Sequence, residues 1–136
     1  MMEPRGIRNC NPLNIRTGSR SRKPWKGEIR PSLDPEFCQF SDMAHGYRAA
    51  MLLLRDYRTL YGLRTPRELI SRWAPPSEND TRGYLGAVCK LTGLDPDEPI
   101  DLSRREVMTS LVAAMSQVEN RRRAVTEDVE AGWHLL

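Results

Sequence analysis

The chain has 136 residues, and its composition of 39% hydrophobic and 29% charged residues is typical of one globular domain. It lacks any apolar run near the roughly 18 residues that a membrane-spanning helix needs, and its charged start lacks the apolar core of a secretory signal. We therefore expect a protein that is made in the cytoplasm and does not insert into a membrane. If its target lies outside the cytoplasm, another factor must deliver it there.

The net charge of +3 is distributed unevenly. Residues 1–30 hold eight Lys or Arg against Glu3 and Glu28, which gives +6 there and −3 for the remainder. A basic segment attracts anionic polymers such as bacterial cell wall or nucleic acid, and the alternative is a solvated loop without a ligand. Because only Trp25 stands among these charges, the aromatic and basic alternation of single-strand binders is missing. From charge alone, bacterial cell wall and nucleic acid both qualify as partners, and the missing alternation disfavours nucleic acid.

Prolines and glycines interrupt residues 1–41, so this segment is predicted to be irregular, with short extended pieces at 13–16 and 37–40. The pattern then becomes helical, and helices are predicted near 42–61, 66–73, 80–92, 104–119 and 127–135. The sequence thus predicts one mainly α (α+β) domain over 1–136, with an irregular, partly β lobe over 1–41 and a helical lobe over 42–136.

Residues that favour helix ends set these boundaries. Ser41 or Asp42 can cap the first long helix, and Asn79 or Asp80 can cap the third. Thr65-Pro66-Arg67-Glu68 and Ser103-Arg104-Arg105-Glu106 both have the spacing of a capping box. Glycines at 62 and 93 suit the left-handed position just beyond a helix.

No metal site and no cofactor are expected. The three cysteines, Cys10, Cys38 and Cys89, are an odd number without metal-type spacing and are predicted to be free thiols. His45 and His134 have no Cys or carboxylate at ligand spacing. Neither a glycine-rich phosphate loop nor a nucleophile elbow is present.

Glu119 is the strongest candidate for a catalytic acid. It lies four residues beyond Met115 and eight beyond Leu111, so it continues the apolar stripe of its helix, near the C-terminal end. Burial and the negative end of the helix dipole both raise the pKa of a carboxyl group. A glycosidase needs such an acid to protonate the leaving oxygen. The alternative is a helix-end glutamate that pairs with one of the arginines at 121–123.

Amide and aromatic side chains near the start are candidates for sugar binding. The run Asn9-Cys10-Asn11-Pro12-Leu13-Asn14 predicts a turn held by side-chain hydrogen bonds, and Asn11 and Asn14 could read the acetamido and hydroxyl groups of amino sugars. Trp25 could stack on a sugar face or fill the core. A purely structural turn fits the amide pattern equally well.

A second group of polar residues surrounds the bend after the second predicted long helix. The segment Trp73-Ala74-Pro75-Pro76-Ser77-Glu78-Asn79 joins the end of one helix to the start of the next. Glu78, Asn79 and the following Tyr84 could line a cleft and bind substrate. As pure structure, the segment is a connector, and Glu78 interacts with the helix dipole.

Taken together, these blocks resemble a family of small phage and prophage proteins that are often described as virion structural proteins. Its patterns match here as Arg-Gly-Ile-Arg-Asn-x-Asn-Pro-x-Asn-Ile-Arg at 5–16, Trp-x-Gly at 25–27, Phe-x-x-Phe at 37–40, Gly-x-Arg-Ala at 46–49, Trp-Ala-Pro-Pro-x-Glu-Asn-x-Thr-x-x-Tyr at 73–84 and Ala-hydrophobic-x-x-x-Glu-Asn at 114–120. Two positions depart from the family: Cys10 replaces the usual Asn, and Arg121 replaces the usual Gly. The resemblance implies partners in a phage virion or a secretion apparatus.

Residues 112–119 also resemble the helix of lytic transglycosylases and related lysozymes that ends in their acidic glutamate. In those enzymes, the lobe with the Asn, Trp-Gly and Phe motifs follows this helix, whereas here it precedes it. A circularly permuted lysozyme-like domain reconciles the two orders, because permutation is tolerated where chain ends lie close together. The resemblance implies that Glu119 is the acid.

The sequence therefore favours cleavage of peptidoglycan glycan strands, by a muramidase or a lytic transglycosylase, at the cell wall or from within a virion. Because no second carboxylate stands out, the transglycosylase route is favoured, although Glu28, Asp34 and Glu36 are possible partners. The main alternative is a non-enzymatic virion or baseplate protein with a degenerate lysozyme-like fold. A third hypothesis is a nucleic-acid binder that uses the basic segment.

Overall fold

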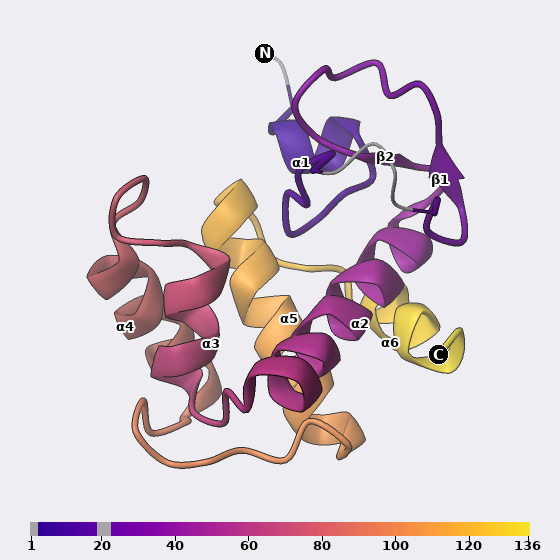
Figure 1. Cartoon of the computed structure of the whole chain (residues 1–136). Helices are drawn as coiled ribbons and strands as arrows, with labels where there is room; N and C mark the ends of the chain where they lie inside the picture. Colours follow the sequence, from indigo (N-terminus) through magenta and orange to yellow (C-terminus); the bar gives the residue numbers. More distant parts are fainter. Residues whose placement is uncertain (1–2, 19–22) are drawn as a thin grey trace.

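The computed structural model describes residues 3–18 and 23–136 (Figure 1). In this part of the chain the helices are α1 (Arg5–Arg8), α2 (Met43–Tyr61), α3 (Pro66–Trp73), α4 (Thr81–Thr92), α5 (Arg105–Asn120) and α6 (Thr126–His134). Two short strands, β1 (Glu28–Ile29) and β2 (Gln39–Phe40), pair antiparallel, with Glu28 opposite Phe40. The predicted mainly α fold class with a small β component is confirmed.

Helix α5 occupies the middle of the molecule, with α3 and α4 on one side and α2 and α6 on the other (Figure 1). The apolar faces of α2 and α5 bury Met51, Leu54, Leu111 and Met115 completely. The N-terminal lobe, residues 3–41 as far as described, packs on the start of α2 and the end of α5. Among the described residues, no helix is both long and apolar enough to cross a membrane.

Most helix ends follow the predicted local signals. Asp42 caps α2 by accepting a hydrogen bond from the His45 backbone N–H at 2.9 Å, and Asp80 accepts one from Gly83 at the start of α4. Thr65 and Glu68 form the predicted capping box of α3. Glycines 62 and 93 take left-handed conformations at the ends of α2 and α4. The five predicted helices therefore lie within one residue of their expected bounds.

The capping box predicted at Ser103–Glu106 is wrong. The Ser103 hydroxyl and backbone N–H both donate to Asp101, at 2.6 and 3.0 Å, so the serine is not available to cap the helix. Helix α5 begins one residue later than predicted, after Arg104, and has no side-chain cap. A carboxylate two residues before the serine competes for it, and the capping-box pattern does not include that position.

The N-terminal lobe is more regular than predicted at one end and less regular at the other. Residues 5–8 form α1, although Pro4 and Gly6 suggested irregular chain. The extended piece predicted at 13–16 is reduced to a single bridge between Arg16 and Phe37, whereas the piece at 37–40 contains β2. Its partner β1 was not predicted.

The basic segment is partly neutralised within its own lobe. Arg5 pairs with Asp34 at 3.0 Å, Arg16 with Glu36 at 3.5 Å, and Arg30 with Glu28 at 3.0 Å. Of the other arginines of this segment, Arg8 is exposed, and those at positions 20 and 22 lie outside the described residues. The +6 of residues 1–30 therefore overstates the charge that this surface presents to a ligand.

Candidate functional site

Glu119, in the last turn of α5, joins the N-terminal lobe to the helical part of the molecule. The Asn14 side-chain amide donates a hydrogen bond to Glu119 Oε1 at 2.9 Å, and the Tyr84 hydroxyl donates one to Oε2 at 2.9 Å. Asn14 comes from the N-terminal lobe and Tyr84 from α4. The structure thus brings three of the predicted site residues together around one carboxyl group.

Burial raises the pKa of the Glu119 carboxyl above its ordinary value, although the hydrogen bonds from Asn14 and Tyr84 act in the opposite direction. Burial also raises the pKa of Tyr84 well above its usual range, so this hydroxyl stays protonated and remains a donor. In the described residues no ion pair joins Glu119 to Arg121, Arg122 or Arg123, and Arg122 pairs with Glu3 instead. Glu119 is therefore a carboxyl group that holds its proton to higher pH than an exposed glutamate.

The turn before Asn14 is organised by Asn11. Asn11 is fully buried, and its amide donates to the carbonyl oxygens of Ile15 and Cys38, each at 2.9 Å, while its own oxygen accepts from the Ile15 N–H. Asn14 then takes a left-handed conformation, with φ of 53°, which Asn tolerates better than most residues. Asn11 thus holds the turn, and Asn14 is the amide that reaches Glu119.

Close packing fixes this turn against α2 and α5. The buried amide of Asn120 donates to the Pro12 carbonyl oxygen at 2.9 Å. A Cβ atom on Gly6 would lie 2.4 Å from Asn120 Oδ1, and one on Gly46 would lie 2.2 Å from the Cys10 carbonyl oxygen. Only glycine permits these two approaches, so the glycines of two sequence motifs allow the lobe to sit against Glu119.

A groove of about 230 Å³ opens beside Asn14 and continues the site along α2 and α3. Its lining residues are Asn14, Ile15, Arg16, Leu53, Tyr57 and Trp73. The rings of Tyr57 and Trp73 pack edge to face, with centroids 5.9 Å apart, and the Trp73 ring N–H donates to the Leu13 carbonyl oxygen at 3.2 Å. Glu119 does not line this groove itself but contacts it through Asn14.

Tyr57 was not predicted as a site residue. It follows Leu53 by four residues on the same face of α2, which by sequence alone indicates core packing. The close packing of Tyr57 with Trp73, sixteen positions later, is a tertiary feature that no local signal in the sequence indicates.

Three other predicted site residues lie apart from Glu119. Trp25 is half-buried and packs against the hydrophobic core. Glu78 and Asn79 are exposed in the turn before α4, where the Asn79 amide donates to the Pro75 carbonyl oxygen. No contact joins either residue to Glu119 in the part of the chain that the structure describes.

The acids considered as a second carboxylate are engaged within the N-terminal lobe. Glu28 accepts hydrogen bonds from the Trp25 backbone N–H and from Arg30. Burial disfavours ionisation of Asp34, but hydrogen bonds from Glu36, Asn9 and Phe37 and the charge of Arg5 outweigh it and hold the pKa of that carboxyl below its usual range. These carboxylates are thus placed to stabilise the lobe.

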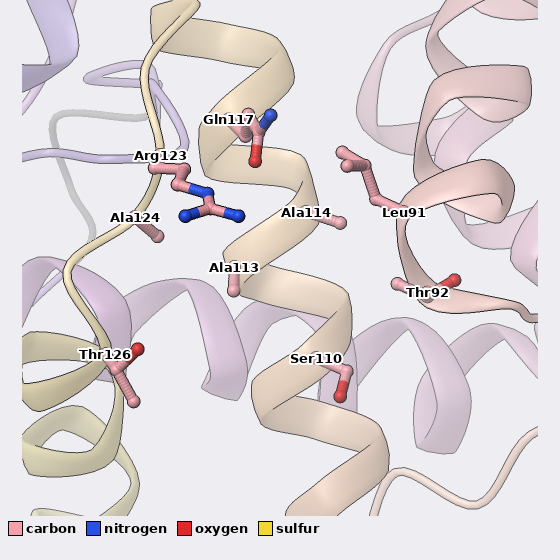
Figure 2. A pocket seen from close by; sticks show the side chains of 9 residues that line it. All are labelled: Leu91, Thr92, Ser110, Ala113, Ala114, Gln117, Arg123, Ala124 and Thr126. Atoms are coloured by element: carbon pink, nitrogen blue, oxygen red, sulfur yellow. The ribbon is translucent and has the colours of Figure 1, made fainter.

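A cavity of about 620 Å³ lies elsewhere on α5 (Figure 2). Figure 2 shows the Arg123 side chain reaching toward the α5 face that carries Ala113, with Leu91 on the opposite wall. None of the residues that contact Glu119 lines this cavity. Its size alone does not identify it as a functional site.

Within residues 3–18 and 23–136, no cluster of three His, Cys, Asp or Glu is arranged to hold a metal ion. Cys10, Cys38 and Cys89 carry free thiols, as predicted.

The two departures from the family pattern share a backbone conformation. Cys10 has a φ of 50° and Arg121 a φ of 53°, both in the left-handed region. Asn and Gly, the residues that the resemblance leads us to expect at these two positions, are the types that adopt this region most easily. The departures therefore change the conformational strain of two turns and leave the contacts of Glu119 intact.

Comparison with known proteins places the chain among phage proteins. No protein-family model matches it. Protein P5 of Pseudoalteromonas phage PM2 is 40% identical over 124 residues, which are 91% of this chain and 76% of that protein. The match agrees with the resemblance of the sequence motifs to phage proteins, and it covers most of the described chain. The chain belongs to the family of Protein P5 of Pseudoalteromonas phage PM2.

Proposed function

We propose that this protein cleaves the glycan strands of peptidoglycan, with Glu119 as the acid that protonates the glycosidic oxygen. The observation that carries the proposal is a half-buried carboxyl group of raised pKa, held by Asn14 and Tyr84 beside an aromatic groove. General acid catalysis works best when the acid still carries its proton near the working pH. Burial of Glu119 favours that state.

The two hydrogen bonds complement this burial during the reaction. After proton transfer, Glu119 is a carboxylate, and the Asn14 amide and the Tyr84 hydroxyl both donate to it. Donors that are already oriented stabilise the charge as it forms, without reorganisation. Burial raises the energy of the ionised state beforehand, and the two donors limit that cost when the proton leaves.

The engagement of Glu28, Asp34 and Glu36 in ion pairs of the N-terminal lobe supports the transglycosylase route over the muramidase route. An acetamido or hydroxyl group of the substrate would then act where other glycosidases use a second carboxylate. On this proposal, the protein acts at the bacterial cell wall after delivery, in keeping with a phage relative. The lysozyme-like fold and its circular permutation form part of the same proposal.

Turnover of purified, insoluble peptidoglycan tests the proposal. Glu119→Gln keeps the shape of the side chain and can still bond to Asn14 and Tyr84, but it has no acidic proton, so release of soluble fragments should fall by about 10² to 10⁴-fold. Glu106→Gln, an exposed glutamate in the first turn of the same helix, is the matched control and should behave as the wild type. Mass analysis separates anhydro products of a transglycosylase from the reducing ends left by a muramidase.

A second candidate function is a non-enzymatic component of a phage particle. The observation that favours it is that both oxygens of Glu119 are bonded to partners within the chain, so that the residue links the N-terminal lobe to α4. If this second function is correct, the wild type should release no fragments from peptidoglycan. Glu119→Leu should then lower the free energy of unfolding, because it leaves the Asn14 amide and the Tyr84 hydroxyl without their acceptor, at about 1–3 kcal/mol each.

A further inference from the structure

The groove at Asn14 is continued by a second one on the far side of Tyr57. This second groove, of about 600 Å³, is lined by Tyr57, Leu63, Glu68, Ser71, Arg72 and Pro75. Tyr57 lines both grooves, so a surface path leads from Asn14, the partner of Glu119, past the Tyr57 and Trp73 rings to Arg72. A ligand that lies at Glu119 and extends along α3 would meet Arg72.

Arg72 is held by aromatic contacts and by a side-chain hydrogen bond with Tyr57, and its remaining N–H donors can bind an anion. Its guanidinium carbon lies 3.8 Å from the Tyr61 ring centroid and 5.2 Å from that of Tyr57. Stacking occupies the flat face of a guanidinium, whereas the N–H donors that grip a carboxylate project from its edge. The aromatic contacts thus orient the charge and restrict its motion before any ligand arrives.

Arg72 has no carboxylate partner within residues 3–18 and 23–136, whereas Arg16, which lines the groove at Asn14, pairs with Glu36. The nearby Glu68 is committed to the start of α3, where it accepts hydrogen bonds from the backbone N–H groups of Arg64 and Thr65, and these bonds lower its pKa. No ion pair joins Glu68 to Arg72 in that part of the chain. An oriented guanidinium therefore stands in a groove without a matching anion.

We propose that this second groove binds the stem peptide of peptidoglycan and that Arg72 pairs with one of its carboxylates. The inference rests on the proposed function, because the glycan strand would lie at Glu119 and its peptide branch in the groove at Arg72. Peptidoglycan is the glycan polymer whose sugars carry short peptides with free carboxylates, so this subsite would select it over an unsubstituted amino-sugar polymer. Arg72 is then a specificity residue, distinct from the groups that act on the glycosidic bond.

Equilibrium binding tests this subsite. The parent is the Glu119→Gln protein, so that the ligand is not consumed, and the two probes are soluble glycan strands with stem peptides and the same strands after an amidase has removed the peptides. The parent should bind the peptide-bearing strands about tenfold more tightly, as expected for one charge-assisted contact at an exposed site. Adding Arg72→Gln should abolish this difference and leave the affinity for bare strands unchanged. Raised salt should reduce the difference in the parent.

Arg123→Gln in the same background is the matched control, because Arg123 is another exposed arginine without an ion pair in the described residues but lies on the cavity of Figure 2. It should retain the tenfold preference. Equal binding of both probes by the parent, or an equal loss for both probes with Arg72→Gln, would overturn the subsite while leaving the proposed function intact. A parent that binds neither probe would overturn the proposed function itself.

Discussion

Replacing Tyr84 with Phe isolates one of the two hydrogen bonds that hold Glu119. Tyr84 is only 9% exposed, and its hydroxyl donates to Glu119 Oε2 at 2.9 Å, so the substitution keeps the ring and removes this single contact. A hydrogen bond to a charged group contributes about 1.5–3 kcal/mol, and one between neutral groups about 0.5–1.5 kcal/mol. The cost of Tyr84→Phe should therefore depend on whether Glu119 is ionised.

The direction of this dependence follows from the pKa of Glu119. Burial raises that pKa in the folded protein, so Glu119 contributes stability that is fully present below its unfolded pKa and is lost as the pH rises through its folded pKa. The bond from Tyr84 opposes this loss, because it favours the carboxylate. Without the hydroxyl, the pKa of Glu119 rises further, and the deficit in the free energy of unfolding should grow from acid toward neutral pH.

Urea unfolding of wild type and Tyr84→Phe between about pH 4 and pH 8 measures this deficit, and carbon NMR of the labelled Glu119 carboxyl follows its titration directly. The deficit should be smallest at the acid end and should approach about 1.5–3 kcal/mol at the other. In a Glu119→Gln background the same substitution should cost the same at every pH. A deficit that stays constant with pH in the wild-type background would refute the reasoning.

Two further predictions concern the turns that place the site. Arg121→Gly should stabilise the protein by about 0.5–1 kcal/mol, because Arg121 is in a left-handed conformation that costs an ordinary residue about 1–2 kcal/mol. Thermal melting measures this gain. An equal gain from Arg122→Gly, where φ is not positive, would contradict the prediction. Gly46→Ala should destabilise by about 1–3 kcal/mol, because its Cβ would lie 2.2 Å from a carbonyl oxygen of the N-terminal turn. Gly86→Ala, where nothing lies within 4 Å of an added Cβ, should instead be neutral or stabilising in α4, and a matching loss there would point to a general effect of helix substitution.

Helix bounds were predictable because their signals act over three or four residues. Asp42, Asp80 and the Thr65–Glu68 box each satisfy backbone N–H groups in the adjacent turn, so the spacing of residue types in the sequence is sufficient. The same reasoning failed at Ser103, since Asp101 lies just outside the capping-box pattern and accepts a hydrogen bond from the Ser103 hydroxyl. Strand β1 was missed because a two-residue strand depends on its partner and not on a period of its own.

The candidate acid was also accessible to sequence reasoning. Glu119 continues the stripe of Leu111 and Met115, both fully buried, and this periodicity alone indicates a carboxyl group that is partly withdrawn from water. The two grooves that share Tyr57 were not accessible, because they depend on how residues of α2 and α3 come together in the folded chain.

The two asparagines of the N-terminal turn separate what the sequence determines from what the tertiary structure determines. By sequence, Asn11 and Asn14 are equivalent amides in one turn, and either could reach Glu119. In the folded chain, the Asn11 amide donates its hydrogen bonds to the carbonyl groups of Ile15 and Cys38, whereas the Asn14 amide donates to the Glu119 carboxyl group. The sequence determined the helices and the burial of Glu119, since both follow from spacing along one element. Only the docking of the lobe decided which amide faces the acid, because that docking depends on backbone approaches between segments more than 30 residues apart, such as that of Gly46 to Cys10.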